Sequence, residues 1–293
     1  MNEHKAGFVS IIGKPNVGKS TLMNQMVGER LSIITSKAQT TRHRILGVLN
    51  GDDFQIVYSD TPGIIKPKYE LHKSMMRFVH TSLDDADVIL FVTDIFEEFD
   101  ENDVIEKLKF VEAPVFVLVN KVDLADQEKV EEKLAYWKEQ VEAKAVLPIS
   151  ALHDFNVETV FKLIMEHLPV HPPFFEKDTL TDKPERFFAA EILREKIFLN
   201  YKQEVPYSCE VTIESFKESD DLIRMRAIIM VERDSQKGIL IGKGGSMLKK
   251  LGMQAREELE TFFQKKVFLE QFVKVVPNWR REKNKLNKFG YND

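Results

Sequence analysis

A loop built to hold phosphate is the first feature of this sequence that could do chemistry. Residues 13–20 match the pattern G-x-x-x-x-G-K-[ST] and directly follow a short apolar run at residues 8–12. Glycines at these positions let successive backbone N–H groups turn inward around phosphate oxygens. The Lys19 ammonium would neutralise charge on the β- and γ-phosphates, and the Ser20 hydroxyl would bind Mg²⁺. The predicted nucleotide contacts here are Gly13, Lys14, Pro15, Asn16, Val17, Gly18, Lys19, Ser20 and Thr21.

A second motif, Asn120-Lys121-Val122-Asp123, predicts which base is bound. The Asp123 carboxylate can accept hydrogen bonds from N1–H and the exocyclic N–H of guanine, a donor pair that adenine lacks on that edge. The asparagine and lysine of the motif would buttress the loop and cover the base. Ser150-Ala151, which follows an apolar run at residues 146–149, would offer a backbone N–H to guanine O6. The sequence therefore favours a guanine nucleotide over ATP.

Two further segments are predicted to respond to the γ-phosphate. Asp60-Thr61-Pro62-Gly63 would hold Mg²⁺ through a water on Asp60 and bring the Gly63 N–H near the γ-phosphate. In the polar loop Gln39-Thr40-Thr41-Arg42, one threonine would complete the Mg²⁺ shell only while the γ-phosphate is present, which would order the loop as a switch. We favour Thr41 over Thr40 for this role. The predicted metal ligands are Ser20, Thr41 and, through water, Asp60; the predicted switch residues are Gln39, Thr40, Thr41, Arg42 and Ile64.

Alternating strands and helices in the first half would bring these motifs to one edge of a sheet. Short, nearly continuous apolar runs suit strands buried on both faces, and the amphipathic stretches between them suit helices. This alternation implies right-handed βαβ units and a doubly wound, mostly parallel sheet, with residues 45–49 as an antiparallel edge strand. The predicted strands are residues 8–12, 55–59, 87–92, 115–119 and 146–149, and the predicted helices are 19–28, 71–84, 102–111, 127–143 and 157–168.

The pattern changes after residue 169, where several prolines interrupt the helical periodicity. A helix, two strands, two helices and a last strand are predicted to follow, over about 90 residues that are distinct from the first half. We predict a first domain over residues 1–170, a linker over 171–185 and a second domain over 186–293 that ends in a basic tail. The predicted elements of the second domain include helix 187–201, strands 208–215 and 222–233, and strand 267–275.

Charge also separates the two halves. The 293 residues carry 42 basic and 47 acidic side chains, yet residues 1–180 hold 20 basic against 29 acidic and residues 181–293 hold 22 against 18. Residues 265–288 alone hold 8 basic and 2 acidic side chains. A polyanionic partner would therefore meet the second half.

The composition excludes several classes of protein. Cys209 is the single cysteine, which excludes an internal disulfide and fits a reducing compartment. No apolar run reaches the roughly 18 residues needed to span a bilayer, and the first residues lack the apolar core of a signal peptide. We therefore expect a cytoplasmic protein, and we expect it to be a monomer.

A second glycine-rich loop, Ile241-Gly242-Lys243-Gly244-Gly245, predicts a contact with nucleic acid. It contains G-x-x-G between two helical stretches, and in KH domains such a loop clamps a single-stranded backbone while the bases lie across an apolar groove. The pattern alone is weak, because any turn between helices can be rich in glycine. One of the RNA contacts predicted below, Trp279, could instead pack against the last strand of the domain. The further predicted RNA contacts, by phosphate pairing or stacking, are Lys249, Lys250, Trp279, Arg280 and Arg281.

Together these residues resemble those of the translation-factor-related GTPases, and the second half narrows the resemblance to the Era family of bacterial ribosome-assembly GTPases. The resemblance implies an α/β P-loop GTPase domain followed by an α+β type II KH domain, with Mg²⁺-dependent hydrolysis of GTP to GDP and phosphate. It also implies binding to the 3′ end of 16S rRNA during assembly of the 30S subunit, and a peripheral membrane contact for which the sequence offers no lipid motif. The residues that carry it are Gly13–Ser20, Gln39–Arg44, Asp60–Gly63, Asn120–Asp123, Ser150-Ala151, Arg194–Ile197, Pro206–Ser208, Gly242–Gly245, Trp279-Arg280 and Gly290-Tyr291.

Two positions leave the mechanism open. Ile64 stands where signalling GTPases carry a water-orienting glutamine, and the Era family shares this apolar replacement, so intrinsic hydrolysis should be slow. Asn16 would either help seat K⁺ near the phosphates, as in K⁺-stimulated relatives, or only stabilise its loop. The alternatives to a GTPase switch are an RNA-binding module with negligible turnover and an ATP-dependent kinase, and the second of these conflicts with Asp123.

Overall fold

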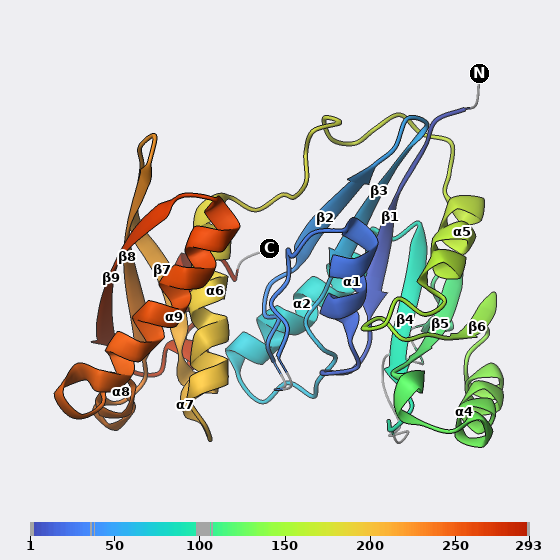
Figure 1. Ribbon diagram of the computed structural model, residues 1–293. Helices are drawn as coiled ribbons and strands as arrows, with labels where there is room; N and C mark the ends of the chain where they lie inside the picture. Colours follow the sequence, from blue (N-terminus) through green and yellow to red (C-terminus); the bar gives the residue numbers. More distant parts are fainter. Residues whose placement is uncertain (1–2, 36, 38, 98–105, 107, 292–293) are drawn as a thin grey trace. The chain divides into compact units, whose positions relative to one another are not determined.

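The computed structural model describes residues 3–35, 37, 39–97, 106 and 108–291 (Figure 1). Contacts between residues divide the chain into two units. One comprises residues up to 67 together with 72–182, and the other comprises residues 68–71 and 183–292. The predicted helix at 102–111 lies largely outside the described residues. In the part of the chain that is described, no helix is both long and apolar enough to cross a membrane.

A six-stranded sheet in the order β2-β3-β1-β4-β5-β6 forms the centre of the first unit. β2 is antiparallel to β3 and the other neighbours are parallel, which confirms the predicted sheet and its edge strand. Every residue of β4 and β5 is buried, as expected for strands covered on both faces. The elements are β1 (Lys5–Ile12), α1 (Lys19–Val27), β2 (Ile45–Asn50), β3 (Phe54–Asp60), α2 (Glu70–Asp84), β4 (Val88–Asp94), β5 (Val115–Asn120), α4 (Gln127–Gln140), β6 (Ala145–Pro148) and α5 (Val157–His167).

Most of the predicted linker is bound to the first unit. The Gln55 side chain accepts hydrogen bonds from the backbone N–H groups of Phe174 (2.7 Å) and Phe175 (2.9 Å), and the Val48 N–H donates to the Leu180 carbonyl (2.8 Å). Residues 171–182 therefore belong to the first unit, and the connection to the second unit is shorter than the predicted 171–185.

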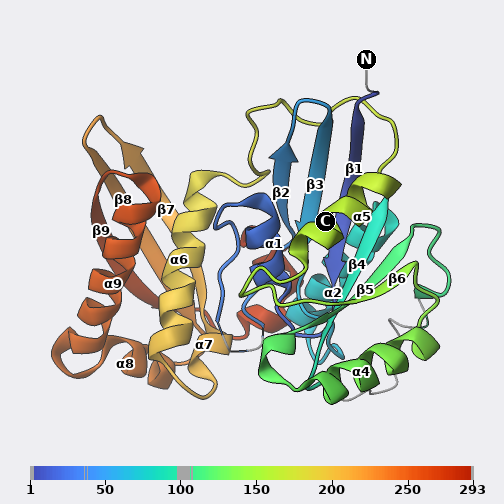
Figure 2. The same ribbon diagram turned by 45° about the vertical axis from the view of Figure 1, so that its right-hand side comes forward.

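The second unit has its own three-stranded sheet, in the order β7-β8-β9 (Figure 2). β7 and β8 are antiparallel, and β8 and β9 are parallel. Side chains of α6 and α9 pack with one face of the sheet into a single apolar core. The predicted order α-β-β-α-α-β is present, with two short helices that were not predicted, α7 before β7 and α10 after β9. The elements are α6 (Glu185–Asn200), α7 (Val205–Ser208), β7 (Glu210–Glu218), β8 (Leu222–Val231), α8 (Asp234–Ile241), α9 (Ser246–Phe263), β9 (Lys266–Val275) and α10 (Lys283–Lys288).

Candidate nucleotide and RNA sites

A cavity of about 550 Å³ lies at the carboxyl ends of the parallel strands of the first unit. This is the edge at which doubly wound sheets bind ligands. The structure brings most of the predicted nucleotide and switch residues together there. Those that line the cavity are Pro15, Asn16, Gly18, Lys19, Ser20, Thr21, Gln39, Thr40, Thr41, Gly63, Asn120, Lys121, Asp123 and Ser150.

The phosphate loop leads directly into helix α1. Gly18 has φ +100°, and a Cβ on it would lie 2.2 Å from the Asn120 side-chain nitrogen, so only glycine fits this position. The first N–H groups of α1 have no partner within the helix, and the helix dipole is positive at this end, which suits an anion. The Lys19 ammonium donates to the backbone carbonyls of Gly13 (3.1 Å) and Lys14 (2.8 Å), so it is held over the loop that would cradle phosphate.

Burial lowers the pKa of the Lys19 ammonium to about 8, although the charges of Asp60 and Glu97 oppose the shift. The folded protein therefore holds this proton less tightly than the unfolded chain, and its stability without nucleotide rises between about pH 8 and pH 10. Bound phosphate would favour the charged lysine and restore its pKa. We therefore expect nucleotide affinity to fall above pH 8, approaching about tenfold per pH unit.

Isothermal titration at pH values between about 7 and 9, in buffers of different ionisation enthalpy, measures both the affinity and the proton uptake. Lys19→Arg is the control, because a guanidinium keeps its proton in this range and should remove the slope even if binding is weaker. A wild-type affinity that does not change across this range would contradict the expectation.

Asn120 joins three loops of the cavity. Its amide nitrogen donates to the Val17 carbonyl (2.8 Å), and its amide oxygen accepts from the Ala151 N–H (2.9 Å). The Lys121 ammonium donates to the Asn16 carbonyl (2.6 Å) and pairs with Asp94 (2.6 Å). These contacts join the phosphate loop to the loop that contains Asn120 and Lys121.

The Asp123 carboxylate lines the cavity and lies 3.7 Å from the His153 imidazole. The backbone N–H of Ser150 donates to the Phe155 carbonyl (3.1 Å), and that of Ala151 is taken by Asn120. Both N–H groups thus have protein partners, and a contact of either with guanine O6 stays a prediction.

Three oxygen side chains meet at the predicted Mg²⁺ site. The Ser20 hydroxyl donates to Asp60 Oδ2 (2.6 Å) and lies 2.9 Å from the Thr41 hydroxyl. Asp60 Oδ1 is buried without a hydrogen-bond partner among the described residues, and burial raises the pKa of this carboxyl against the opposing effects of Ser20 and Lys19. A hard divalent cation prefers such oxygen ligands, so the residues fit Mg²⁺.

The same contacts distinguish the two threonines of the switch loop. The Thr40 hydroxyl bonds with Thr35 (2.8 Å) and donates to the Lys37 carbonyl (2.7 Å), away from Ser20. Thr41 is therefore the threonine that the structure places beside Ser20 and Asp60.

Several predicted residues support the cavity without lining it. The Thr61 hydroxyl donates to the Ile11 carbonyl (2.9 Å), and the Ile64 N–H donates to the Gly13 carbonyl (3.0 Å). Ile64 is buried and its side chain has no group that could orient a water. The predicted residues outside the lining are Gly13, Lys14, Val17, Arg42, Asp60, Thr61, Pro62, Ile64 and Ala151.

The cavity also has lining residues that the sequence analysis did not name. Leu124 and Leu152 are 60% and 74% exposed and come directly after the base-binding motif and after Ser150-Ala151. Exposed leucines at such positions offer apolar surface for the faces of a base. In the sequence, only their position next to these motifs indicates that they line the cavity. The other unnamed lining residues are Ile33, Ile34, Thr35 and His153.

The second glycine-rich loop connects α8 to α9. Gly242 has φ 70° and ψ 173°, a conformation open essentially only to glycine, and Gly244 has φ 58°. Three predicted RNA contacts, Lys243, Lys249 and Lys250, are exposed on the loop and on the first turns of α9. This backbone and these charges suit a phosphate chain.

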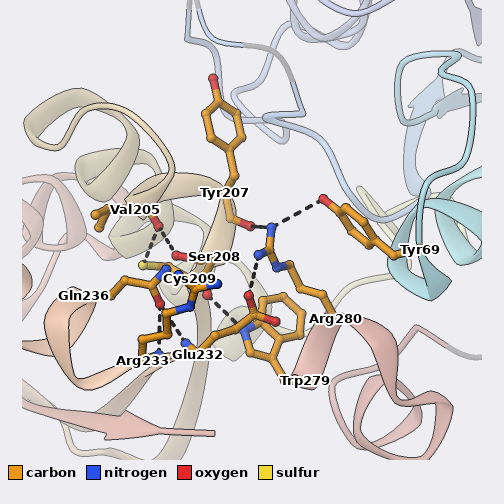
Figure 3. Close-up of polar contacts among 10 residues, drawn as sticks. All are labelled: Tyr69, Val205, Tyr207, Ser208, Cys209, Glu232, Arg233, Gln236, Trp279 and Arg280. Atoms are coloured by element: carbon orange, nitrogen blue, oxygen red, sulfur yellow. Dashed lines mark hydrogen bonds and ion pairs between the residues drawn. The ribbon is translucent and has the colours of Figure 1, made fainter. Parts of the chain in front are cut away.

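The structure corrects the RNA role predicted for Trp279. Its side chain is fully buried, and its indole N–H donates to the Ser208 carbonyl (2.9 Å), so it cannot stack on a base (Figure 3). The neighbouring Arg280 pairs with Glu232 and contacts the Tyr207 carbonyl (3.4 Å), so its charge is already matched by a carboxylate. Of the predicted RNA residues in this segment, Arg281 is the exposed one.

Family models match a segment in each of the two units. Residues 8–121 match the family described as "50S ribosome-binding GTPase", and residues 204–280 match the KH domain. GTPase Era of Staphylococcus haemolyticus is 43% identical over 99% of this chain and 98% of its own length.

Two solved structures are similar along the whole chain. A variant of Aquifex aeolicus Era bound to GDP and AlF4⁻ has 41% identity and a TM-score of 0.94, and the match covers 99% of this chain and 100% of that one. Era in complex with MgGDPNP and nucleotides 1506–1542 of 16S ribosomal RNA has 41% identity and a TM-score of 0.91, with the same coverage.

Proposed function

The chain belongs to the Era family of GTPases, and from this premise we propose that it binds the 3′ end of 16S rRNA and acts in assembly of the 30S subunit. One observation carries the proposal: a cavity lined by the predicted guanine-nucleotide residues and an exposed G-x-x-G loop occur in the same chain. The related Era that was solved with MgGDPNP and nucleotides 1506–1542 of 16S ribosomal RNA resembles this chain along its whole length.

In the GTPase unit, the residues at and beside the cavity have different roles in binding and hydrolysis of the nucleotide. Asp123 selects guanine, Lys19 and the N–H groups at the start of α1 bind the phosphates, and Ser20, Asp60 and Thr41 would hold Mg²⁺. The ion would neutralise charge on the β- and γ-phosphate oxygens. Because Ile64 cannot orient the attacking water, we expect slow hydrolysis in the absence of another group or a partner.

The γ-phosphate is proposed to control RNA binding through the loops around Thr41 and Gly63. Both residues line the cavity, so the two loops can respond to what fills it. We expect the protein with a GTP analogue to bind an RNA of nucleotides 1506–1542 more tightly than the protein with GDP. Fluorescence anisotropy with labelled RNA measures the ratio. Equal affinities would remove the switch mechanism, because a ligand that binds both states equally cannot shift their populations.

Crosslinking to RNA in a lysate, followed by sequencing of the bound fragments, tests the RNA target itself. Recovery of fragments from the 3′ end of 16S rRNA is the expected result. Recovery of unrelated RNA with no enrichment at that end would contradict the proposed target.

We further propose that Asn16 helps to seat K⁺ beside the phosphates. Asn16 has φ 66°, is exposed and lines the cavity, so it lies beside the loop that would cradle the phosphates. A monovalent cation would supply the positive charge that an arginine finger supplies elsewhere. Phosphate release should be faster in K⁺ than in Na⁺ buffer, and Asn16→Ala should reduce the difference. Identical rates in the two buffers would rule the proposal out.

A further inference from the structure

The β7-β8-β9 sheet has a second face that the helices of its unit do not cover. Along β8, the side chains of Ile223, Met225 and Ala227 belong to the apolar core shared with α6 and α9. Successive side chains of a strand point to opposite faces, so Arg224 and Arg226 point away from that core, and both are exposed. Figures 1 and 2 draw α6 and α9 on one side of this sheet. We call the other side the outer sheet face.

Two phenylalanines lie on this face. Phe268 and Phe272 of β9 are each 50% exposed, and the Val267 side chain beside them is buried on the opposite side. They are four residues apart, which is about 13 Å along a strand. The Arg224 guanidinium lies 5.7 Å from the Phe268 ring centre, and that of Arg226 lies 5.5 Å from the Phe272 ring centre. Each ring therefore contacts an arginine, and each phenylalanine remains half exposed.

The outer sheet face is also positively charged. Lys217 is paired across the sheet with Arg224, and Lys274 follows Phe272 on β9. The carboxylates of Glu270 (3.0 Å) and Glu214 (3.7 Å) both face Arg226. Among the described residues, no carboxylate lies within ion-pair distance of Lys217, Arg224 or Lys274. The face thus combines exposed aromatic rings with uncompensated cations.

We infer that the outer sheet face is a second RNA contact, at which unpaired bases stack on Phe268 and Phe272 while phosphates pair with Arg224, Lys217 and Lys274. The inference rests on the proposed RNA-binding function and extends it beyond the G-x-x-G loop. Aromatic rings interleaved with basic side chains are the pattern with which proteins hold single-stranded nucleic acid. A protein partner would need carboxylates opposite these cations but would not require ring faces.

RNA truncations combined with two double variants test this inference. RNA of nucleotides 1506–1542 is shortened from each end to the smallest fragment that the full-length protein still binds. The wild-type protein should bind the long RNA roughly tenfold to hundredfold more tightly than this minimal fragment. The double variant F268L with F272L keeps apolar side chains but removes the rings. It should bind the long RNA no more tightly than the minimal fragment. F268W with F272W keeps the ring faces and should retain the advantage of the long RNA.

All variants should bind the minimal fragment as the wild type does and should hydrolyse GTP at the wild-type rate without RNA. Matching thermal unfolding would show that the variants are folded. The inference is overturned if the leucine variant keeps the full advantage of the long RNA, or if the wild type shows no advantage. Failure of every fragment to bind would instead contradict the proposed function.

Discussion

Asp123→Asn should lower the affinity for GTP by about a thousandfold or more and create affinity for xanthosine triphosphate. The Asp123 carboxylate lines the cavity and can accept both N–H groups of the guanine edge, whereas an amide presents donors there. Xanthine carries an oxygen where guanine has its amino group, so the new amide can donate to it. Competition of unlabelled GTP and xanthosine triphosphate against a labelled guanine nucleotide measures the exchange of specificity.

Asp126→Asn is the matched control for this variant. Asp126 is three residues away and caps α4 by accepting a hydrogen bond from the Lys129 N–H (2.9 Å), and an asparagine side chain can make the same bond. It is not among the lining residues of the cavity, so its substitution should leave nucleotide preference unchanged. Unchanged guanine selectivity in the Asp123 variant would show that another group reads the base.

Lys243→Asp combined with Gly244→Asp should reduce RNA affinity by about a hundredfold at physiological salt. The substitutions change the charge of the exposed loop from +1 to −2 where phosphates are expected to bind. GTP hydrolysis without RNA should not change, because neither residue lies at the nucleotide cavity. Anisotropy titrations over a range of salt concentrations measure the effect, and the salt dependence of binding should become weaker as well.

The corresponding asparagine variant, Lys243→Asn with Gly244→Asn, separates charge from shape. A Cβ at Gly244 meets nothing within 4 Å, and the left-handed conformation at φ 58° is one that asparagine and aspartate adopt more readily than other residues. Both variants should therefore fold alike. The asparagine variant should lose only the contribution of one lysine. Equal losses in the two variants would mean that loop shape, rather than charge, controls RNA binding.

The parts of the site that were predictable from the sequence depend on local chain geometry. The phosphate loop needs its glycines because Gly18 adopts a positive φ close to Asn120, and such a requirement leaves a fixed spacing in the sequence. Strand and helix periodicity then placed the Asp60 and Asp123 motifs at the same sheet edge. Thr41 was favoured over Thr40 from the sequence, but periodicity does not show the contact that distinguishes them, which is that of the Thr41 hydroxyl with Ser20.

Features that depend on contacts between residues far apart in the chain could not be predicted from the sequence. A tryptophan in a basic segment suggests stacking on a base, but the indole of Trp279 is buried because the Ser208 carbonyl, 71 residues earlier, accepts its N–H. Residues 171–182 have the composition of a linker, yet Gln55, about 120 residues earlier, binds Phe174 and Phe175. No local pattern encodes such pairs, since each is set by the tertiary fold.

Closure of the first unit by its last residues also bears on synthesis of the chain. The Ala6 N–H donates to the Pro169 carbonyl (3.1 Å) and the His171 N–H to the His4 carbonyl (3.0 Å), so the beginning and end of this unit meet. Its long-range contacts can be complete once residue 182 is available. Translation at about 5–20 residues per second then needs about 5–20 s more to finish the second unit. During this interval the emerging protein can bind GTP while its RNA-binding unit does not yet exist.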